Sequence, residues 1–403
     1  MGIDSGNPNL WYIDLNETES DIGATGGLFV LPNFTSHYFG QVGDIGSSIK
    51  FKLYNYRETP IVIENVNFTT SSFQSNSLFP ITILPFSWGE INIEANNSTT
   101  GPVNDEMEFI SEDFSDELKV SLSLNGSSGN LLGGNISGTF DSAEYIITSD
   151  IIIAEQDYVY LQPGTKFLFE NGTNFNIYGT LNAIGNEQDS IIFESRYNNN
   201  NFLSWNGISF EEVDHSTILK YFRISDIVNN EGGSILLDNS TPILKNFIIS
   251  DNKGIYGGGI FLINNSNPYI KDGIINGNST FNENLLRGGG LAIGSSSGYF
   301  EDVLITNNFS PSGGGVYLFE SNPEFINLTI VNNTADIGSG LVIDCNSTPN
   351  IVNSIIYHNS SVVPIIIDDF GNLGCILNEP NIRFSNIEGG WQGEGNINVN
   401  PLF

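Results

Sequence analysis

Three aspartates in the C-terminal quarter of the chain have the type and spacing for acid–base chemistry. Asp368 and Asp369 are adjacent within an apolar run, and Asp344 lies one sequence repeat earlier. A glycoside hydrolase needs two carboxyl groups at a suitable separation. Neighbouring strand residues point to opposite faces, so Asp344 and Asp368 could form a stacked pair whereas Asp368 and Asp369 could not share one groove. The alternative interpretation is that all three are solvated turn residues.

A second set of oxygen-bearing side chains lies near the N-terminus. Asp14, Asn16, Thr18 and Asp21 follow the spacing D-x-N-x-T-x-x-D, which places oxygen ligands at alternating positions of a loop. Glu17 stands where such a loop usually has a glycine for its sharp turn. Calcium is the cofactor that this pattern predicts. The sequence contains no zinc-type cysteine and histidine spacing, and no phosphate-binding glycine loop followed by a helix.

Between Gly232 and Asn359 the sequence repeats itself about every 25 residues, as stacked repeat proteins do. Each unit holds a small-residue cluster such as Gly257-Gly258-Gly259, short β-branched runs, and an apolar stretch that ends in asparagine. These terminal asparagines are Asn252, Asn278, Asn308, Asn333 and Asn359. The pattern predicts an all-β solenoid, a right-handed parallel β-helix, because glycine, asparagine and proline turns separate strand-forming runs too short for helices.

Equivalent residues of successive coils should stack one strand spacing apart, about 4.8 Å. We therefore expect the five asparagines to form a structural ladder in which each side-chain amide donates to the next carbonyl. We also expect these asparagines to adopt the left-handed turn conformation. A second column should run beside the ladder; its members are Asn246, Asp272, Asp302, Asn327 and Asn353. The alternative role for both columns is a row of ligand-binding polar groups.

The charge balance excludes one class of partner. The chain has 13 Lys and Arg against 46 Asp and Glu, a formal charge of −33. Such a surface repels nucleic-acid phosphates. No apolar run is long enough to span a membrane, and no signal peptide is visible at the N-terminus. Cys345 and Cys375 lie close to one repeat apart, so a disulfide between neighbouring coils and two unpaired core cysteines both remain open.

Residues 36–124 lack the repeat and read as alternating strands, which predicts a β-sandwich. The stretches "DIGSSIKFKLYNYRETPIVIENVNF", "ITILPFSWGEINIEA" and "EFISEDFSDELKVSLSLNG" resemble the hydin-like (ASH-type) immunoglobulin domains of bacterial surface proteins. That resemblance implies a spacer domain.

Residues 125–403 form the predicted β-helix. The element "LQPGTKFLF…NIYGTLNAIG" resembles the first coils of secreted bacterial right-handed β-helix proteins, within a fold that includes pectate lyases and adhesins. The pair Asp368-Asp369 is similar to that of polygalacturonases, yet the accompanying Gly-His-Gly and Arg-Ile-Lys elements are missing. The few basic residues of the repeat do not form a pectate-lyase-like arginine motif; they are Lys245, Lys253, Lys271 and Arg287.

Residues 1–35 contain a tail, "DSGNPNLWYIDLNETESDIGATGG", that resembles the segment ending such a β-helix. The chain itself closes on "GEGNINVNPLF". We expect either that the chain is a fragment of a longer protein or that the tail of one subunit caps the last coil of another.

These observations favour a non-catalytic extracellular or cell-surface protein with a structural or adhesive role. Its β-helix faces would bind a glycan or a partner protein through aromatic and polar side chains. The exposed aromatic candidates are Tyr256, Tyr269, Tyr299, Tyr317 and Trp391. The alternatives are a polysaccharide-degrading lyase or hydrolase that uses Asp344, Asp368 and Asp369, and a filament subunit that self-associates head to tail.

Overall fold

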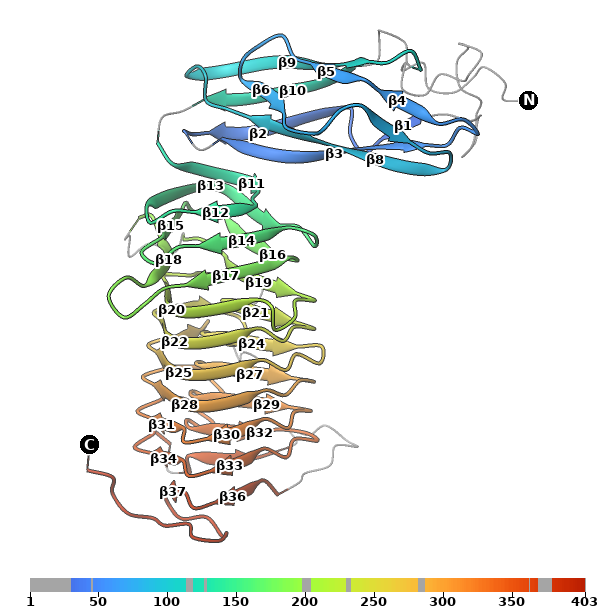
Figure 1. Ribbon diagram of the computed structural model, residues 1–403. Coiled ribbons are helices and arrows are strands. Elements are labelled where there is room, and N and C mark those ends of the chain that lie inside the picture. The colour runs from blue at the N-terminus through green and yellow to red at the C-terminus, as the bar shows by residue number, and fades with distance from the viewer. Residues whose placement is uncertain are drawn as a thin grey trace. The chain divides into compact units, whose positions relative to one another are not determined.

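The computed structural model describes residues 30–44, 46–113, 119–126, 129–197, 204–229, 233–281, 287–361, 363–368 and 379–402, and its regular elements there are all strands. The chain divides into two compact units, which are Met1–Asn135 and Ile136–Phe403. The predicted fold class is confirmed, because small sheets in the first unit are followed by one long parallel sheet of about 25 strands (Figure 1). Within the described ranges, no helix is long and apolar enough to cross a membrane.

The first unit is a sandwich of two four-stranded sheets, β1-β3-β8-β6 and β2-β10-β9-β5, with the small pair β4-β7 beside them. Alternate residues of the long strands β3 and β8, such as Phe51 and Ile91, are buried between the sheets. The strands of this unit are β1 (Val30–Pro32), β2 (Ser36–Val42), β3 (Ser47–Asn55), β4 (Ile61–Ile63), β5 (Asn65–Asn67), β6 (Phe73–Ser75), β7 (Ile81–Ile83), β8 (Ser87–Ala95), β9 (Gly101–Ile110), β10 (Lys119–Gly126) and β11 (Leu131–Asn135).

The second unit is a parallel β-helix. Its strands up to the middle of the unit are β12 (Gly138–Phe140), β13 (Glu144–Ile153), β14 (Tyr158–Leu161), β15 (Lys166–Phe169), β16 (Asn174–Ile177), β17 (Thr180–Ile184), β18 (Ile191–Ser195), β19 (Gly207–Glu211), β20 (Ile218–Ser225), β21 (Ile235–Asp238), β22 (Ile243–Ser250), β23 (Lys253–Gly254), β24 (Ile260–Ile263) and β25 (Tyr269–Asn276). The remaining strands are β26 (Ser279–Thr280), β27 (Leu291–Gly294), β28 (Tyr299–Thr306), β29 (Val316–Phe319), β30 (Glu324–Ile326), β31 (Thr329–Val331), β32 (Leu341–Ile343), β33 (Asn350–Val352), β34 (Ile355–Tyr357), β35 (Ile365–Ile367), β36 (Asn381–Arg383) and β37 (Asn386–Ile387).

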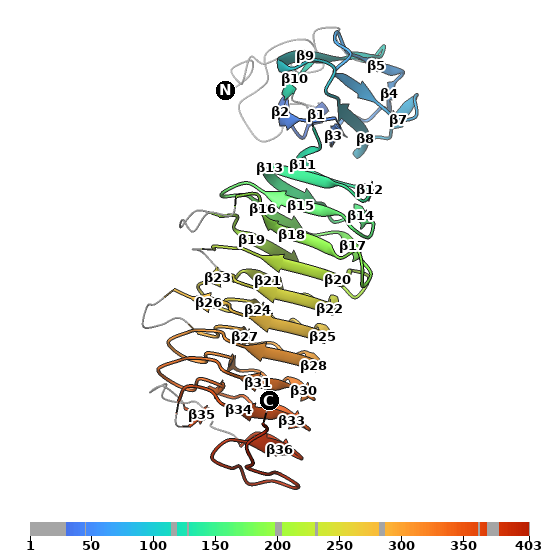
Figure 2. The ribbon, with the colours of Figure 1, turned by 90° about the vertical axis from the view of Figure 1, so that its left-hand side faces the viewer.

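Each coil has three faces, and each strand pairs with the equivalent strand of the next coil. The first face contains β19, β21, β24, β27, β29, β32 and β35. The second face contains the beginnings of β20, β22, β25 and β28, then β30, β33 and β36. The third face contains the ends of those long strands, then β31, β34 and β37. The coils rise along one axis in both ribbon views (Figure 2).

The corner between the second and third faces bends at a single residue with positive φ. The predicted second column occupies this corner: Asn246, Asp272, Asp302, Asn327 and Asn353 have φ of 51°, 56°, 56°, 55° and 54°. Asparagine and aspartate tolerate this left-handed conformation better than other side chains, which explains their recurrence here. The column is therefore a bending device.

The corner between the third and first faces contains the asparagine ladder. Each Nδ2 donates to the Oδ1 of the next coil, at 2.9 Å from Asn252, 3.1 Å from Asn278, 3.0 Å from Asn308 and 3.1 Å from Asn333. The same Oδ1 atoms also accept the backbone N–H groups of the preceding ladder residues. All five side chains are buried, so the ladder satisfies polar groups that water does not reach.

The expectation that the ladder asparagines themselves are left-handed is wrong. Positive φ falls one residue earlier, at Asp251, Gly277, Asn307, Asn332 and His358. The left-handed residue turns the chain, and the ladder asparagine then points its amide inward, where it can reach both neighbouring coils. Turning and hydrogen bonding are thus divided between two adjacent residues.

The small-residue clusters make room for this ladder. A Cβ atom on Gly315 would lie 2.6 Å from the carbonyl oxygen of Gly340 and 3.1 Å from the Asn333 amide. Gly259 is equally confined, by Gly290 and Asn278. Any larger residue would push successive coils apart, which explains why the cluster recurs in each repeat.

The corner between the first and second faces contains a serine column that sequence analysis missed. The backbone N–H groups of Ser240, Ser266, Ser296 and Ser321 each donate to the serine Oγ of the next coil, at 2.9, 3.1, 3.3 and 3.1 Å. The last acceptor is Ser347. These serines are buried, so they are a structural counterpart of the asparagine ladder. Most of these serines lie two residues before a proline, and this spacing could have identified the column from the sequence.

Replacing Asn308 by alanine should destabilise the β-helix by about 2–4 kcal/mol, because the amide and the backbone N–H of Asn278 lose their buried acceptor. Urea unfolding followed by circular dichroism measures this loss. The matched control is Asn307→Gly on the exposed neighbour, whose φ of 55° suits glycine. Equal losses in the two variants would contradict a structural role for the ladder.

Candidate functional site

Asp344, the central residue of the predicted catalytic set, lies in a buried ionic cluster. Its Oδ2 accepts hydrogen bonds from Arg287 Nη1 at 3.1 Å and from the Tyr317 hydroxyl, and its Oδ1 accepts the Cys345 backbone N–H at 2.7 Å. The side chain of Asp344 is 4% exposed, whereas that of Arg287 is 28% exposed. Both carboxylate oxygens are therefore engaged by protein groups, which fits a structural role.

Tyr317 joins the two charged members of this cluster. Its hydroxyl also accepts a hydrogen bond from Arg287, whose guanidinium carbon lies 4.7 Å from the ring centroid. Burial, followed by the hydrogen bond to Asp344, raises the pKa of Tyr317 far above its ordinary value, although Arg287 opposes the shift. A phenol that holds its proton this firmly is a hydrogen-bond donor and not a base at neutral pH.

The register aligns the predicted carboxylate pair. Ile343 pairs with Ile367, so Asp344 and Asp368 occupy equivalent positions of successive coils, and the Asp368 N–H donates to the Ile343 carbonyl at 3.2 Å. Asp369 lies outside the described residues. Because the Asp344 carboxylate is committed to Arg287 and Tyr317, the alignment does not by itself give a catalytic pair.

Of the residues in the metal and disulfide predictions, the structure describes only Cys345. Asp14, Asn16, Thr18 and Asp21 lie outside the described residues. Among the residues that the structure does describe, no group of three or more histidine, cysteine, aspartate or glutamate side chains could hold a metal ion. Cys345 is disulfide-bonded, and Cys375, the only other cysteine in the sequence, also lies outside the described residues.

The aromatic candidates differ in how much of each ring is available. Tyr317 was expected to be exposed, but it is 4% exposed because Arg287 and Asp344 enclose it. Tyr256 is 37% exposed and packs beside Phe261. Tyr269 and Tyr299 stack on each other on the second face, with centroids 5.2 Å apart, and the Lys245 ammonium lies 4.7 Å from the Tyr269 centroid. Tyr269 and Tyr299 are both partly exposed. Trp391 is partly exposed.

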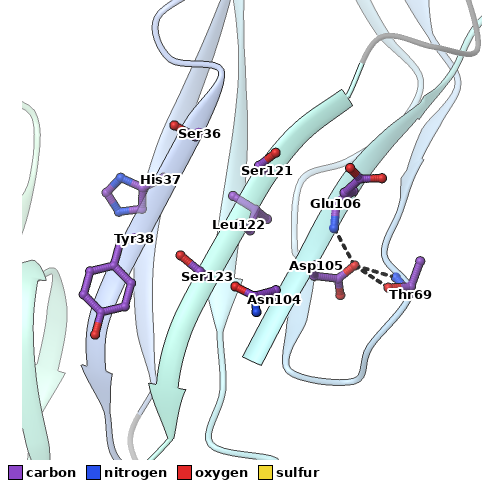
Figure 3. Close-up of a pocket in the computed structure, with 10 residues that line it drawn as sticks. All are labelled: Ser36, His37, Tyr38, Thr69, Asn104, Asp105, Glu106, Ser121, Leu122 and Ser123. Carbon is purple, nitrogen blue, oxygen red and sulfur yellow. Dashed lines mark hydrogen bonds between the residues drawn. The ribbon is translucent and has the colours of Figure 1, made fainter. Parts of the chain in front are cut away.

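A hollow of about 480 Å³ lies on the outer face of sheet β2-β10-β9-β5 in the sandwich (Figure 3). Its one buried carboxylate, Asp105, accepts hydrogen bonds from the hydroxyl and N–H groups of Thr69 and Thr70 at 2.6–2.9 Å. Burial alone would raise the pKa of Asp105, but these hydrogen bonds outweigh it and lower the pKa below its ordinary value. The Asp105 carboxylate holds the turn at Thr69 and Thr70, so the role of this residue in the hollow is structural.

A second hollow, of about 320 Å³, lies at the corner between the third and first faces, and we call it the corner hollow. The short strands β23 and β26 lie along this edge of the β-helix in Figure 2. The residues that line the corner hollow are Tyr197, Ser204, Asp226, Ile227, Val228, Asp251, Asn252, Lys253, Gly277 and Ser279.

Two stacked carboxylates form one side of the corner hollow. Asp226 and Asp251 occupy equivalent positions, because Ser225 pairs with Ser250, and both are left-handed corner residues with φ of 62° and 59°. Their Cα atoms are thus about one strand spacing, about 4.8 Å, apart. Asp251 is exposed and Asp226 is partly exposed, whereas Ile227 and Asn252, the residues that follow them, are buried.

Gly277 makes the hollow possible. It is the corner residue of the next coil, and a Cβ atom there would lie 2.9 Å from Asp251 Oδ1. The following coils carry Asn307, Asn332 and His358 at the same position, so a side chain fills the space that glycine leaves open. The hollow is therefore a local interruption of the repeat.

The remaining groups of the corner hollow offer stacking and hydrogen bonding. Tyr197 is 44% exposed, and the Arg196 guanidinium carbon lies 5.4 Å from its ring centroid. The Lys253 ammonium lies 4.4 Å from the Phe281 ring centroid. Two carboxylates, serine hydroxyls, an ammonium and an exposed tyrosine in one hollow can bind a small polyhydroxylated group. Sequence analysis missed Asp226, Asp251 and Tyr197, although the gap at Gly277 was visible in the repeat.

Comparison with known proteins gives no family for this chain. No protein-family model matches it, and no curated protein matches it. A solved protein of unknown function from Porphyromonas gingivalis W83 aligns with 24% of this chain and 46% of its own length, at 11% identity and a TM-score of 0.22. The chain therefore spans less than half of that protein.

Two further solved structures align with different shares of the chain. The ASH/PapD-like domain 7 of human CEP192 aligns with 25% of this chain and 84% of its own length, at 13% identity and a TM-score of 0.18. Dex49A from Penicillium minioluteum aligns with 87% of this chain and 77% of its own length, at 10% identity and a TM-score of 0.18. At TM-scores of this size, none of these similarities supports a conclusion about function.

The substitution Asp344→Asn should lower the free energy of unfolding by about 3 kcal/mol, because it leaves Arg287 and Tyr317 without their buried acceptor charge. Chemical unfolding measures the change, and Asp336→Asn at an exposed position of the β-helix is the control. A variant as stable as the wild type would contradict the structural assignment of Asp344.

The raised pKa of Tyr317 predicts a stability loss at high pH. The folded protein keeps this proton to higher pH than the unfolded chain, whose phenol has an ordinary pKa of 10.0. The contribution of Tyr317 is therefore complete below about pH 10 and is lost as pH rises toward the folded pKa. The difference in unfolding free energy between wild type and Tyr317→Phe should shrink as the pH rises from about 10 to about 11.5. A constant difference across that range would refute this linkage.

Proposed function

We propose that this chain is a non-catalytic extracellular surface protein that adheres to a glycan through the corner hollow of its β-helix. The resemblance of its repeats to secreted bacterial β-helix proteins, and of its sandwich to ASH-type spacer domains, supports the extracellular location. Its charge of −33 favours partners without phosphate or polyanionic character. The N-terminal segment from Asp14 to Asp21 remains our candidate for binding calcium.

The observation that carries this proposal is the lining of the corner hollow. Asp226 and Asp251 stand one coil apart, and Asp226 Oδ2 already accepts the Ser225 hydroxyl at 2.9 Å. A sugar ring bound in the hollow would therefore donate its hydroxyls mainly to Asp226 Oδ1 and to the Asp251 carboxylate. The exposed ring of Tyr197 can pack against the carbon–hydrogen face of the same sugar. About 320 Å³ is at the lower end of the usual range for small-molecule sites and suits one sugar unit.

The charges of the hollow favour an uncharged sugar. Two carboxylates and one ammonium line it, so a uronate would bring a further negative charge against Asp226 and Asp251. A neutral sugar instead presents several hydroxyls, which can donate to the carboxylates and accept from Lys253 and the serines. We therefore expect a terminal or branching neutral sugar as the bound unit.

A second candidate function is glycoside hydrolysis, and one observation favours it. Asp226 and Asp251 are two carboxylates at equivalent positions of neighbouring coils, and glycoside hydrolysis needs a pair of carboxyl groups. This candidate function moves the acid and nucleophile roles from Asp344 and Asp368 to another corner of the coil. It requires turnover, which adhesion does not.

Replacing Tyr197 by alanine should weaken glycan binding at least about tenfold, the equivalent of about 1.4 kcal/mol. Binding is measured by titration calorimetry with a glycan selected on a polysaccharide array. The matched control is Tyr158→Ala, because Tyr158 is 46% exposed and lies on the second face of the β-helix, outside the hollow. Equal affinities of the two variants would place the binding site elsewhere.

The substitution Asp251→Asn separates the two candidate functions. Adhesion predicts weaker binding and no release of shorter chains by either protein. Hydrolysis predicts that the wild type releases new reducing ends and that the variant binds the glycan but no longer cleaves it.

A further inference from the structure

One end of the sandwich carries four aromatic side chains on the outer face of sheet β1-β3-β8-β6. They are Tyr54 in β3, Tyr56 just after β3, Phe86 just before β8 and Trp88 in β8; we call them the aromatic face. Phe86, Trp88 and Tyr56 are 67%, 51% and 41% exposed. Exposed apolar patches of this kind mark interaction surfaces in soluble proteins.

The loop that presents this face is fixed from below. Asn55 is fully buried, and its Nδ2 donates to the carbonyls of Thr59, Ile83 and Leu84 at 2.9, 3.1 and 3.2 Å. Phe86 has a φ of 53°, a conformation that a bulky side chain adopts only where its surroundings impose it. The aromatic side chains are therefore held in place before any partner arrives, which lowers the entropic cost of binding.

Charged residues continue the same outer face in two rows of opposite sign. Lys50 and Lys52 lie on β3, and Glu90 and Glu94 lie on β8; the residues between them, such as Phe51 and Ile91, point into the core. The register sets Lys52 opposite Glu90 and Tyr54 opposite Trp88. Lys50 also pairs with Glu90 at 3.5 Å, with both side chains about one third exposed.

This arrangement is complementary to itself. A two-fold axis parallel to the strands, running between β3 and β8, would lay β3 of one copy over β8 of the other at the same height. Lys52 of each copy then faces Glu90 of the other, and Tyr54 faces Trp88. Closed dimers require such self-complementary patches. We propose that the aromatic face and the Lys52/Glu90 rows form a two-fold interface between two copies of this chain.

The overall charge makes this face the favoured place for self-association. Two chains of −33 each repel one another, so contact is most favourable where basic residues offset acidic ones. Three of the 13 basic residues, Lys50, Lys52 and Arg57, lie within eight residues at this end of the sandwich. Aromatic residues at the centre and paired charges around them are the composition of protein–protein interfaces. This inference is independent of glycan binding by the β-helix.

The test uses charge reversal in the full chain, with mass measured by sedimentation equilibrium. The wild type should approach twice 44.0 kDa at high concentration. Lys52→Glu sets a glutamate against Glu90 of the other copy, and Glu90→Lys sets a lysine against Lys52 of the other copy, so each variant alone should dissociate at least tenfold more readily. An equimolar mixture of the two should associate again, and a chain carrying both changes should dimerise as the wild type does.

Folding of the variants is checked by thermal unfolding, which should change little because exposed ion pairs contribute little stability. Trp88→Ala is a second probe, since it removes the apolar centre without altering charge, and it should also abolish the dimer. A wild type that stays at 44.0 kDa overturns the proposal, even if Trp88 then proves necessary for retention on a polysaccharide. Single variants that dimerise as well as the wild type, or a mixture that fails to associate, overturn it too.

Discussion

The stacking of equivalent corner residues is the constraint on which the β-helix depends. Each corner turns the chain and leaves backbone N–H groups inside the coil, where water cannot satisfy them. The Asn308 side chain meets this need by accepting from Asn278 and donating to Asn333, and the serine column does the same at another corner. Gly315 must then be small, because its neighbours are the next coil's carbonyl and the ladder amide. The repeat in the sequence is the consequence of these contacts.

Much of this fold could be predicted because it is periodic. The spacing of the asparagines from Asn252 to Asn359 predicts a stacked ladder, and the β-branched runs between turns predict strands. The left-handed conformation was assigned one residue too late, since the propensity of asparagine for positive φ does not distinguish Asn307 from Asn308. The buried state of Asp344 was not predictable from its own coil. It depends on Arg287, two coils away, and on Tyr317 between them.

The corner hollow shows how a departure from the repeat opens a space on the surface of the β-helix. A strict repeat gives every coil the same surface, so a hollow on one coil requires that its sequence differ from the repeat. Here Gly277 occupies the position at which later coils have Asn307 or His358. The stacked pair Asp226 and Asp251 follows from the same register that builds the ladder, because the corner residue points outward when the ladder residue points inward. The same turn thus carries a ladder residue and a residue that lines the corner hollow. The resemblance to known families supports only the proposed extracellular role.

The most direct test of this account measures binding and turnover in one sample. The full chain is incubated with neutral polysaccharides, and its retention on each is compared with the release of new chain ends. The account predicts saturable retention on at least one glycan with no increase in reducing or unsaturated ends over prolonged incubation. Release of shorter chains in proportion to protein concentration would contradict it, and would assign the carboxylates of the corner hollow to catalysis.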